Sequence, residues 1–463
     1  MNHKYHLKRL IVLLASAMLL IAQTGVFAFT WFNSYVEAGA LDKPFFFMGN
    51  FAVIFLYALM LLLFFLLSRS FQVGHLRTFE VLFSQILSVL CVNAVTYIQL
   101  CLIGHWKFMT HMEPVIWMTV ADTVIVFCWV AFNRWVVTKV YPPRGLLLVY
   151  GPYSPDNLIH KIQGREDKYE IREVVSYEED FEVIKEKILR YRCVVMTDLP
   201  AEFRNKLLKF CFREDIRCYA VPKISDIMIM SAQDTHLFDT SMLLFRNRGL
   251  TLGQRAMKRM LDIVVSLVAL LVFSPFMLVI AILIKCYDGG PVFYAQDRLT
   301  RGGRVFKVLK FRSMRVQKPG DEYCMTRKND ERITPVGKVI RAIHFDELPQ
   351  LINILKGDMS VVGPRPETPK LAAQYKESIP EFDFRLKVKA GLTGFAQVYG
   401  KYNTTPYDKL KLDLTYIENY SFLLDLKLLV LTFEILFAKD NTEGIESWQT
   451  HAEIRKKETA AKK

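Results

Sequence analysis

The sequence predicts a multi-domain integral membrane protein. It predicts an N-terminal four-helix membrane bundle, a Rossmann-like α/β domain, and a C-terminal α/β domain with a re-entrant membrane helix and interfacial amphipathic helices. Three observations lead there: four long apolar runs near the N-terminus, a middle section of alternating short apolar and amphipathic runs, and a later section of cationic, Gly- and Pro-marked segments. The expected boundaries are 1–143, 144–245 and 252–440, with a polar tail over 441–463.

The composition agrees with a chain that lies partly in lipid. The 463 residues fit about three domains, and the hydrophobic share of 52% is high for a soluble protein. The formal charge of +14 suits nucleic acid or an anionic membrane surface. Because the basic residues flank apolar runs, we favour the membrane and expect no nucleic acid. The eight cysteines and nine histidines lack metal-binding spacings, so free thiols are expected.

Four membrane helices are predicted over residues 10–31, 44–68, 81–106 and 114–133. The last run is interrupted by Asp122, which is either a functional intramembrane charge or a group with a structural polar partner. The cations that flank the runs are Lys4, Lys8, Arg9, Arg69, Arg77, Arg134, Lys139 and Arg144. By the positive-inside rule both ends of the bundle face the cytoplasm.

The middle section predicts a small parallel α/β domain. Strands are expected over 146–150, 171–175, 193–196 and 216–221, with helices such as 181–191 and 201–213 between them. The first turn, Gly151-Pro152-Tyr153-Ser154-Pro155, lacks the G-x-G-x-x-G pattern of dinucleotide-binding domains. A scaffold or regulatory role is therefore the safer interpretation.

A re-entrant membrane helix is predicted over residues 256–286. Its uncharged part, 263–284, is long enough to span a bilayer, but both flanks are basic. Ser274-Pro275 lies in the middle, where proline removes a backbone hydrogen bond and breaks the helix. We expect the chain to enter the cytoplasmic leaflet and return. The alternative is a Pro-kinked fifth span, which would carry the rest of the chain outside.

Strands are predicted over 292–296 and 305–311, around a Gly302-Gly303 turn, followed by a polar loop over 317–332. The apolar helical stretch 410–439 contains too many charges to span a membrane, so it is expected to lie at the interface.

The segment 345–367 contains two adjacent carboxylates, Asp346 and Glu347. Apolar residues follow them with helical spacing at Leu348, Leu351, Ile352 and Leu355, with Pro349 in the first turn and Gly357 as the stop. The pair is therefore predicted at the positive end of a helix, which suits phosphates or a bound cation. Alone, the pair would be read as an N-cap and a first-turn acid.

Cationic segments flank this pair in the sequence at 310–314, 363–366 and 387–398. Together with the acids, they indicate a site that handles a metal-bound phosphate ester.

At these motifs the chain resembles the bacterial sugar transferases, which are polyprenol-phosphate phosphoglycosyl transferases. The resemblance covers about residues 252–438, and the remainder looks like the long-form members with a membrane bundle and a Rossmann-like insert. It implies transfer of a hexose-1-phosphate from a UDP-sugar to undecaprenyl phosphate, with release of UMP. That reaction is the first membrane step of exopolysaccharide, capsule or O-antigen synthesis. It implies a bacterial plasma (inner) membrane location, with the catalytic domain on the cytoplasmic side.

The resemblance also implies roles for individual residues. Asp346 would be the nucleophile that takes up the phosphosugar, and Glu347 would hold the metal or manage a proton; both are candidate ligands of Mg²⁺. The residues implied for phosphate binding are Arg341, Arg365, Lys310, Arg312 and Arg298, and those implied for the bend of the re-entrant helix are Ser274 and Pro275. Lys310 and Arg312 could instead serve lipid headgroups. Ala390 and Lys401 depart from the family's usual proline and arginine.

Two other classes remain as alternatives. A membrane-anchored nucleotide-sugar dehydratase or epimerase would need a glycine-rich loop and a Y-x-x-x-K motif, which is matched only at Tyr407 to Lys411. A non-catalytic membrane scaffold would not need the intact acids and arginines. The sequence leaves the sugar open, and a homodimer is compatible with the large membrane surface.

Overall fold

The structure is a computed structural model that describes residues 2–37, 47–68, 70–71, 78–103, 112–140, 143–166, 168–245, 249–315, 332–400 and 404–436. The chain divides into two compact units, Met1–Val221 and Pro222–Lys463, which are described one at a time. Several predictions lie outside the described residues: the polar tail over 441–463, the loop over 317–331, the loop cations Arg69 and Arg77, and the departure at Lys401.

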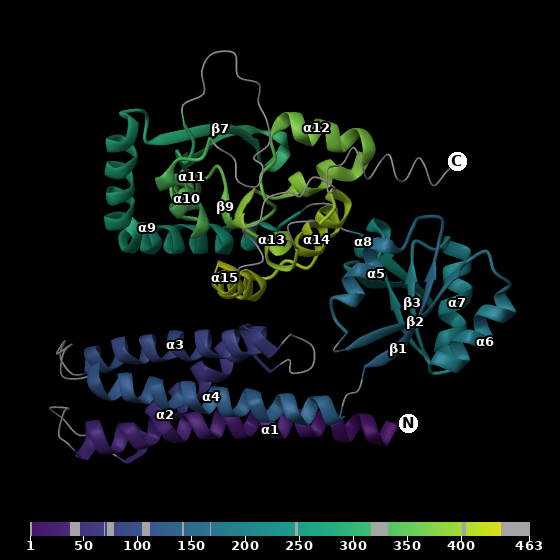
Figure 1. Cartoon of the computed structure of the whole chain (residues 1–463), viewed down its shortest axis with the longest axis horizontal. Coiled ribbons are helices and arrows are strands. Elements are labelled where there is room, and N and C mark those ends of the chain that lie inside the picture. Colours follow the sequence, from purple (N-terminus) through teal and green to yellow (C-terminus); the bar gives the residue numbers. More distant parts are fainter. Residues whose placement is uncertain are drawn as a thin grey trace. The chain divides into compact units, whose positions relative to one another are not determined.

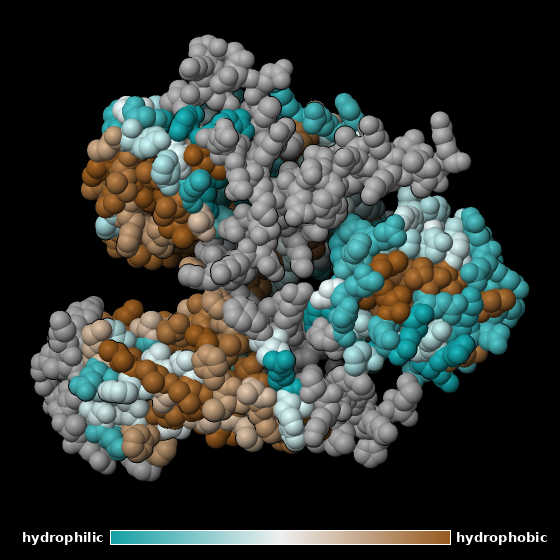
Figure 2. Space-filling model, in the orientation of Figure 1, coloured by the Kyte–Doolittle hydropathy of each residue, from teal (hydrophilic) through white to brown (hydrophobic). Residues whose placement is uncertain are grey.

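The first unit begins with long helices over the four predicted apolar runs (Figure 1). They are α1 (Asn2–Thr30) with its π-helical continuation (Trp31–Glu37), α2 (Phe47–Leu67), α3 (Thr78–Ile103) and α4 (Met112–Val140). Each includes a stretch long and apolar enough to cross a membrane. Figure 2 shows hydrophobic residues, in brown, over much of their visible surface. Lipid accommodates such exposed apolar side chains, so this is a membrane protein.

Asp122 lies inside this bundle, fully buried, with polar neighbours. Its Oδ2 atom is 3.3 Å from the Tyr57 hydroxyl and accepts a hydrogen bond of 3.2 Å from Asn93 Nδ2. Polar partners of this kind reduce the cost of a carboxyl group at membrane depth. Of the two alternatives for Asp122, the structure therefore agrees with a group that has structural polar partners.

A four-stranded parallel sheet follows the bundle, as predicted. The strands are β1 (Arg144–Tyr150), β2 (Tyr169–Ser176), β3 (Cys193–Thr197) and β4 (Arg217–Ala220), in the order β2-β1-β3-β4, and the helices are α5 (Asp156–Gln163), α6 (Phe181–Tyr191) and α7 (Ala201–Arg213). The centre of β1 is completely buried, as expected for a strand covered on both faces. The parallel α/β prediction is confirmed.

The second unit opens with α8 (Ile224–Met230) and the antiparallel hairpin β5 (Gln233–Leu237) and β6 (Thr240–Leu244). A 37-residue helix, α9 (Leu252–Asp288), follows and contains Pro275. Its ribbon turns sharply along its length (Figure 1). The predicted break is therefore a bend within one assigned helix. Proline explains the bend because it has no N–H to donate to the preceding turn. Its ring also clashes with a backbone carbonyl of that turn.

The N-terminal part of α9 is fixed to the second unit by buried polar contacts. Lys258 Nζ lies 2.7 Å from Asp425 Oδ2, and Asp262 Oδ1 accepts hydrogen bonds of 2.8 Å from Ser360 and from the Val361 amide. Further along α9, exposed apolar side chains include Leu267, Leu271, Phe276, Val279 and Leu283. The helix thus begins as part of the domain core and continues with an apolar exposed surface.

After α9 the chain forms an antiparallel hairpin of β7 (Phe293–Leu299) and β8 (Val305–Phe311), which confirms the two predicted strands. Its tip is a short 3₁₀ turn (Arg301–Gly303), in which Gly302 and Gly303 have φ angles of +71° and +77°. Glycine adopts such angles without a steric penalty.

The remaining elements surround the site. They are α10 (Pro335–Ala342), the 3₁₀ turn η4 (Phe345–Glu347), α11 (Gln350–Lys356), β9 (Ser360–Val362), α12 (Pro369–Ser378), η5 (Pro380–Lys387), β10 (Gly391–Thr393), α13 (Phe395–Tyr399), α14 (Pro406–Glu418) and α15 (Phe422–Leu436). The parallel strands β9 and β10 approach closely, since a Cβ on Gly391 would lie 2.1 Å from the Gly363 nitrogen.

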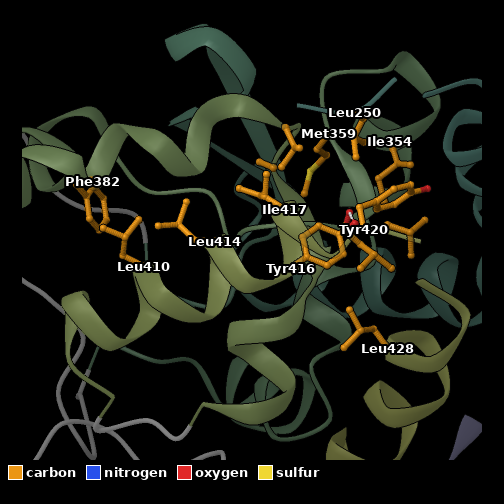
Figure 3. Packing of buried hydrophobic residues seen from close by; sticks show 14 of the residues in the cluster. Leu250, Ile354, Met359, Phe382, Leu410, Leu414, Tyr416, Ile417, Tyr420 and Leu428 are labelled. Atoms are coloured by element: carbon orange, nitrogen blue, oxygen red, sulfur yellow. Dashed lines mark hydrogen bonds between the residues drawn. The ribbon is translucent and has the colours of Figure 1, made fainter. Parts of the chain in front are cut away.

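One helix was predicted over 410–439, but the structure has two, α14 and α15. The Ser421 hydroxyl accepts a hydrogen bond from the Leu424 amide and so starts a new helix. Buried residues of α14, α15 and α11 form one core, and Figure 3 shows Leu414, Ile417 and Tyr416 of α14 within it. The interfacial position of these helices remains a prediction.

Candidate active site

Lys310 and Arg365 meet at one carboxylate oxygen of Glu347. Lys310 lies near the end of β8, and its Nζ atom is 2.7 Å from Glu347 Oε1. Arg365 follows β9, and its Nη2 atom is 2.9 Å from the same oxygen. The Glu347 side chain is only 15% exposed, so solvent screens these contacts weakly.

The charge of Glu347 is set by these two cations. Burial alone would raise its pKa, but the charges of Arg365 and Lys310 and their hydrogen bonds outweigh burial and hold the pKa well below its usual value. Glu347 in turn raises the pKa of Arg365. The carboxylate is therefore ionised and held in one place.

Asp346 has a different environment. Burial raises the pKa of its carboxyl group, and the charge of Glu347 acts in the same direction, whereas Lys310 and Arg341 oppose the increase. Within the described ranges, no side chain forms a hydrogen bond or ion pair with the Asp346 carboxylate. One acid of the pair is thus held by cations, while the other is available to react.

The acid pair lies in the 3₁₀ turn η4 before the α-helix, so the prediction that it begins the helix is wrong by about one turn. Pro349 explains the difference. It has no N–H to donate to the Phe345 carbonyl, which accepts instead from Leu348 at 3.3 Å. His344, between α10 and η4, adopts the left-handed conformation with a φ of 56°. The α-helix α11 then runs over Gln350–Lys356, and Gly357 caps its end, as predicted.

The bend of α9 packs against the residue that precedes Asp346. The Phe345 ring lies 5.7 Å from the Phe273 ring and 6.4 Å from the Phe276 ring, centroid to centroid. Ser274 and Pro275 stand between these two phenylalanines in the sequence, and the Ser274 hydroxyl donates to the Leu271 carbonyl at 3.0 Å. Aromatic contacts therefore connect the helix segment that contains Ser274 and Pro275 to the residue before Asp346.

The turn that carries Arg365 is held by two further arginines. Arg298 Nη1 donates to the Pro366 carbonyl at 2.9 Å, and Arg385 Nη2 donates to the Arg365 carbonyl at 2.9 Å. Arg385 also lies 2.8 Å from Asp413 Oδ2, in α14. Arg298 thus supports the backbone of the turn. Arg385 was not among the predicted site residues, and Asp413 is one of the charges that led us to expect the stretch 410–439 at the membrane interface.

Two other cations of the predicted cationic segments have different neighbours. Arg312 is buried and forms a two-pronged ion pair with Asp288, at the end of α9. Lys389, in the cationic segment 387–398, lies beside Gly357 at the opposite end of α11. Asp346, Glu347, Lys310, Arg341 and Arg365 thus act on one another. Arg298 instead contacts the backbone of the Arg365 turn, and Arg312 pairs with Asp288.

The acid pair is compatible with Mg²⁺. The described residues contain no group of three or more His, Cys, Asp or Glu side chains arranged to hold a metal. Mg²⁺ does not require such a group, because it is commonly bound through one or two carboxylates together with substrate phosphates and water. Asp346 and Glu347 provide those carboxylates, and nearby cations would face the phosphates.

Comparison with known proteins identifies the family. The sequence profile described as bacterial sugar transferase matches residues 253–439, which include the whole site. A relative from Aeromonas hydrophila, a UDP-N-acetylgalactosamine-undecaprenyl-phosphate N-acetylgalactosaminephosphotransferase, is 33% identical over 322 residues, or 67% of this chain and 70% of the relative. The chain belongs to the bacterial sugar transferase family.

Two further relatives share mainly the region of the site. A UDP-glucose:undecaprenyl-phosphate glucose-1-phosphate transferase of Caulobacter vibrioides is 38% identical over 189 residues, covering 40% of this chain and 71% of the relative. The exopolysaccharide production protein ExoY of Rhizobium meliloti is 40% identical over 192 residues, covering 38% of this chain and 83% of the relative. The names of the Aeromonas and Caulobacter relatives share undecaprenyl phosphate but differ in the sugar.

Proposed function

We propose that this enzyme transfers a hexose-1-phosphate from a UDP-sugar to undecaprenyl phosphate, giving undecaprenyl-diphosphate-sugar and UMP. The observation that carries the proposal is the contrast within the acid pair: Glu347 is held by Lys310 and Arg365, while Asp346 has no described hydrogen-bonding partner. The family membership and the activities named for the relatives support the same reaction class.

The transfer would take place in two displacements. An Asp346 carboxylate oxygen attacks the phosphorus that carries the sugar, the bond from that phosphorus to the UMP oxygen breaks, and UMP leaves with the electron pair. A phosphate oxygen of undecaprenyl phosphate then attacks the same phosphorus, a diphosphate forms, and the carboxylate of Asp346 is restored. Covalent catalysis lets a soluble donor and a lipid acceptor use one site in turn.

The side chains around Asp346 would act mainly through charge. Both reactants are anions, so neutralisation of phosphate charge dominates the barrier. Arg365 has N–H groups besides the one that contacts Glu347, and Arg341 lies close enough to Asp346 to affect its pKa. Both could grip phosphate oxygens through their planar guanidinium groups. Mg²⁺, held by Asp346 and Glu347, would supply further neutralisation of the diphosphate.

The proposal places α9 in the membrane as a re-entrant helix. Its first turns bury Lys258 and Asp262 within the second unit, so that part is not available to cross a bilayer. The bend near Pro275 and the exposed apolar residues beyond Asp262 suit a helix that dips into one leaflet and returns. With basic flanks, the site would face the cytoplasm from the inner membrane, where UDP-sugars are made. Residues 252–440 would form the catalytic domain.

The proposal is tested by measuring UMP release from a panel of UDP-sugars in the presence of undecaprenyl phosphate and Mg²⁺. Wild type is expected to release UMP and form a radiolabelled lipid with one preferred sugar. Asp346→Asn is expected to do neither, while Asp383→Asn, a change at an exposed carboxylate, is expected to retain activity. Equal UMP release by wild type and Asp346→Asn would remove Asp346 as the nucleophile. No release by folded wild type would favour the scaffold alternative.

A further inference from the structure

Four cationic side chains gather around the C-terminal end of α11, at the other end of that helix from Asp346 and Glu347. They are Arg259 of α9, Arg301 and Arg304 at the tip of the β7–β8 hairpin, and Lys389 before β10, and we name them the Gly357 cluster. A Cβ placed on Gly357 would lie 3.6 Å from Lys389 Nζ and 3.7 Å from Arg259 Nη2. These two cations are therefore close neighbours.

A buried threonine fixes the segments that carry the cluster. The Thr300 hydroxyl donates to the Asp358 carbonyl at 2.8 Å and accepts from the Ala390 amide at 3.2 Å. Thr300 precedes Arg301, Asp358 follows Gly357, and Ala390 follows Lys389, so one side chain connects all three segments. Thr300 is only 2% exposed, so this connection lies in the interior of the domain.

The carboxylates near the cluster do not balance its charge. Arg304 is paired with Asp358, at 2.9 Å. Asp262 also acts on Lys389, and its Oδ1 already accepts hydrogen bonds from Ser360 and Val361. Among the described residues, the four cations thus face the carboxylates of Asp358 and Asp262.

Lys389 illustrates this imbalance. Within the part of the chain that the structure describes, its ammonium group has no hydrogen bond or ion pair. Burial lowers its pKa, and the charges of Arg259, Arg301 and Arg304 lower it further, against a smaller opposing effect of Asp262. Like charges held together by a rigid fold are destabilising unless an anion lies between them. An anion placed between these cations would relieve their mutual repulsion.

The cluster stands where α9 begins its exposed apolar surface. Arg259 is followed by Met260 and Val264, whose side chains are 59% and 54% exposed. Cations beside membrane-facing apolar residues are placed at the depth of phospholipid headgroups. Arg259 is also oriented by hydrogen bonds to the Ile354 and Leu355 carbonyls, at 2.6 and 2.7 Å.

We infer that the Gly357 cluster is a second anion site, separate from the acid pair, which binds a phosphate group. Two sources can supply that chemistry: the headgroup of an anionic phospholipid, or a soluble phosphate such as inorganic phosphate or UMP. Binding a headgroup would fix the start of α9 at the membrane surface, and with it the depth of the site at the other end of α11.

The test measures the thermal unfolding midpoint of the purified full chain in nonionic detergent. Short-chain phosphatidylglycerol, short-chain phosphatidylcholine, inorganic phosphate and UMP are each titrated at constant ionic strength. The variants are Lys389→Gln and Arg301→Gln, and the matched control is Lys370→Gln, which removes an exposed cation on α12 outside the cluster. Because Lys389 lacks a described partner, Lys389→Gln is expected to be at least as stable as wild type before ligand is added.

Phosphatidylglycerol is expected to raise the midpoint of wild type and of Lys370→Gln, with phosphatidylcholine having no such effect. In Lys389→Gln the apparent affinity should fall about tenfold, the loss typical of one charged hydrogen bond. A Lys389-dependent response to inorganic phosphate or UMP instead would support the site and identify a soluble source. Equal responses of wild type, Lys389→Gln and Arg301→Gln to every phosphate compound, or no response at all, would overturn the inference. The readout is binding, so it is independent of the proposed transferase activity.

Discussion

The Nζ atom of Lys310 lies 2.7 Å from Oε1 of Glu347, which ties the end of β8 to the turn that carries both acids. Lys310 also lowers the pKa of the neighbouring Asp346 without forming a described ion pair with it. One lysine therefore acts on both carboxyl groups: it holds the position of one and favours the ionised form of the other.

Replacement of Lys310 by Met should move the pH dependence of UMP release. The nucleophile must be ionised, so activity falls as pH drops through the pKa of Asp346, which is raised above its ordinary value. Without Lys310 that pKa rises further, and the acidic limb of the kcat/KM profile should shift toward higher pH. Lys310→Arg keeps the charge and should shift it much less. Superimposable profiles for all three proteins would contradict the role of Lys310.

Arg365→Lys should weaken donor binding. Arg365 contacts Glu347 through Nη2 only, which leaves the rest of its guanidinium group for phosphate oxygens. A lysine cannot reproduce that planar fork. We expect about a tenfold or larger rise in KM for the UDP-sugar, the order of one charge-assisted hydrogen bond. Arg213→Lys, at an exposed pair in α7, provides the control and should leave KM unchanged.

Phe345→Ala should reduce activity by separating the acid pair from the bend of α9. The ring of Phe345 packs against Phe273 and Phe276 on either side of Ser274 and Pro275. Each such aromatic pair contributes about 0.5–1.5 kcal/mol. We expect a fall in kcat that is larger with a membrane-embedded acceptor than with a short-chain soluble one. Phe212→Ala, at a 91% exposed position in α7, should change neither rate. Equal loss with both acceptors would indicate a general packing defect.

The buried pair of Lys258 and Asp425 should be important for stability. Lys258 and Asp425 are 7% and 0% exposed, and the Tyr416 hydroxyl donates to Asp425 Oδ1 at 2.8 Å. Asp425→Asn leaves a buried cation without its counter-charge and should destabilise the protein by about 3–5 kcal/mol. Tyr416→Phe, which removes only a hydroxyl, should cost about 1 kcal/mol. Glu202→Gln breaks a solvent-exposed pair with Lys206 and should be within about 1 kcal/mol of wild type in denaturant unfolding.

The sequence predicts the local elements well because periodicity and turn residues report on neighbouring positions. The parallel strands, the β7–β8 hairpin and the residues of the acid pair were all expected. The start of α11 was misplaced because the pattern of Leu348, Leu351 and Ile352 does not show how Pro349 shifts the hydrogen bonding.

Contacts between segments that are distant in the sequence were harder to predict. Nothing in the sequence pairs Arg385 with the Arg365 carbonyl, places Lys389 at the far end of α11, or buries Arg312 against Asp288. These depend on how the α9, η5 and α14 segments pack, and a single sequence carries no local signal for that packing. A cationic motif alone therefore does not show whether a side chain binds phosphate or holds a backbone carbonyl of the protein.

The stability of the protein should depend on pH through Asp413. Burial raises the pKa of Asp413 to about 6, with Arg385 opposing and Glu367 adding to the increase. In the unfolded chain an aspartate has a pKa of about 3.9. The folded state therefore binds the proton more tightly. The contribution of this tighter proton binding to the free energy of unfolding is fully present below the pKa of the unfolded state. It is lost as the pH rises through about 6. Asp413→Asn resembles the protonated form and should lack this dependence.

The measurement is the unfolding midpoint of wild type minus that of Asp413→Asn, followed from acidic to neutral pH in detergent. The difference should fall as pH rises through the folded-state pKa and then level off. Glu377→Gln, at an exposed carboxylate of α12, is the matched control for removal of one acidic charge. A difference that stays constant across that range, or rises, would mean that Arg385 keeps Asp413 ionised in the folded protein. In that case Arg385 and Asp413 would form a salt bridge that stabilises the Arg365 turn at all physiological pH values. Such a salt bridge is broken only when acid protonates the carboxylate.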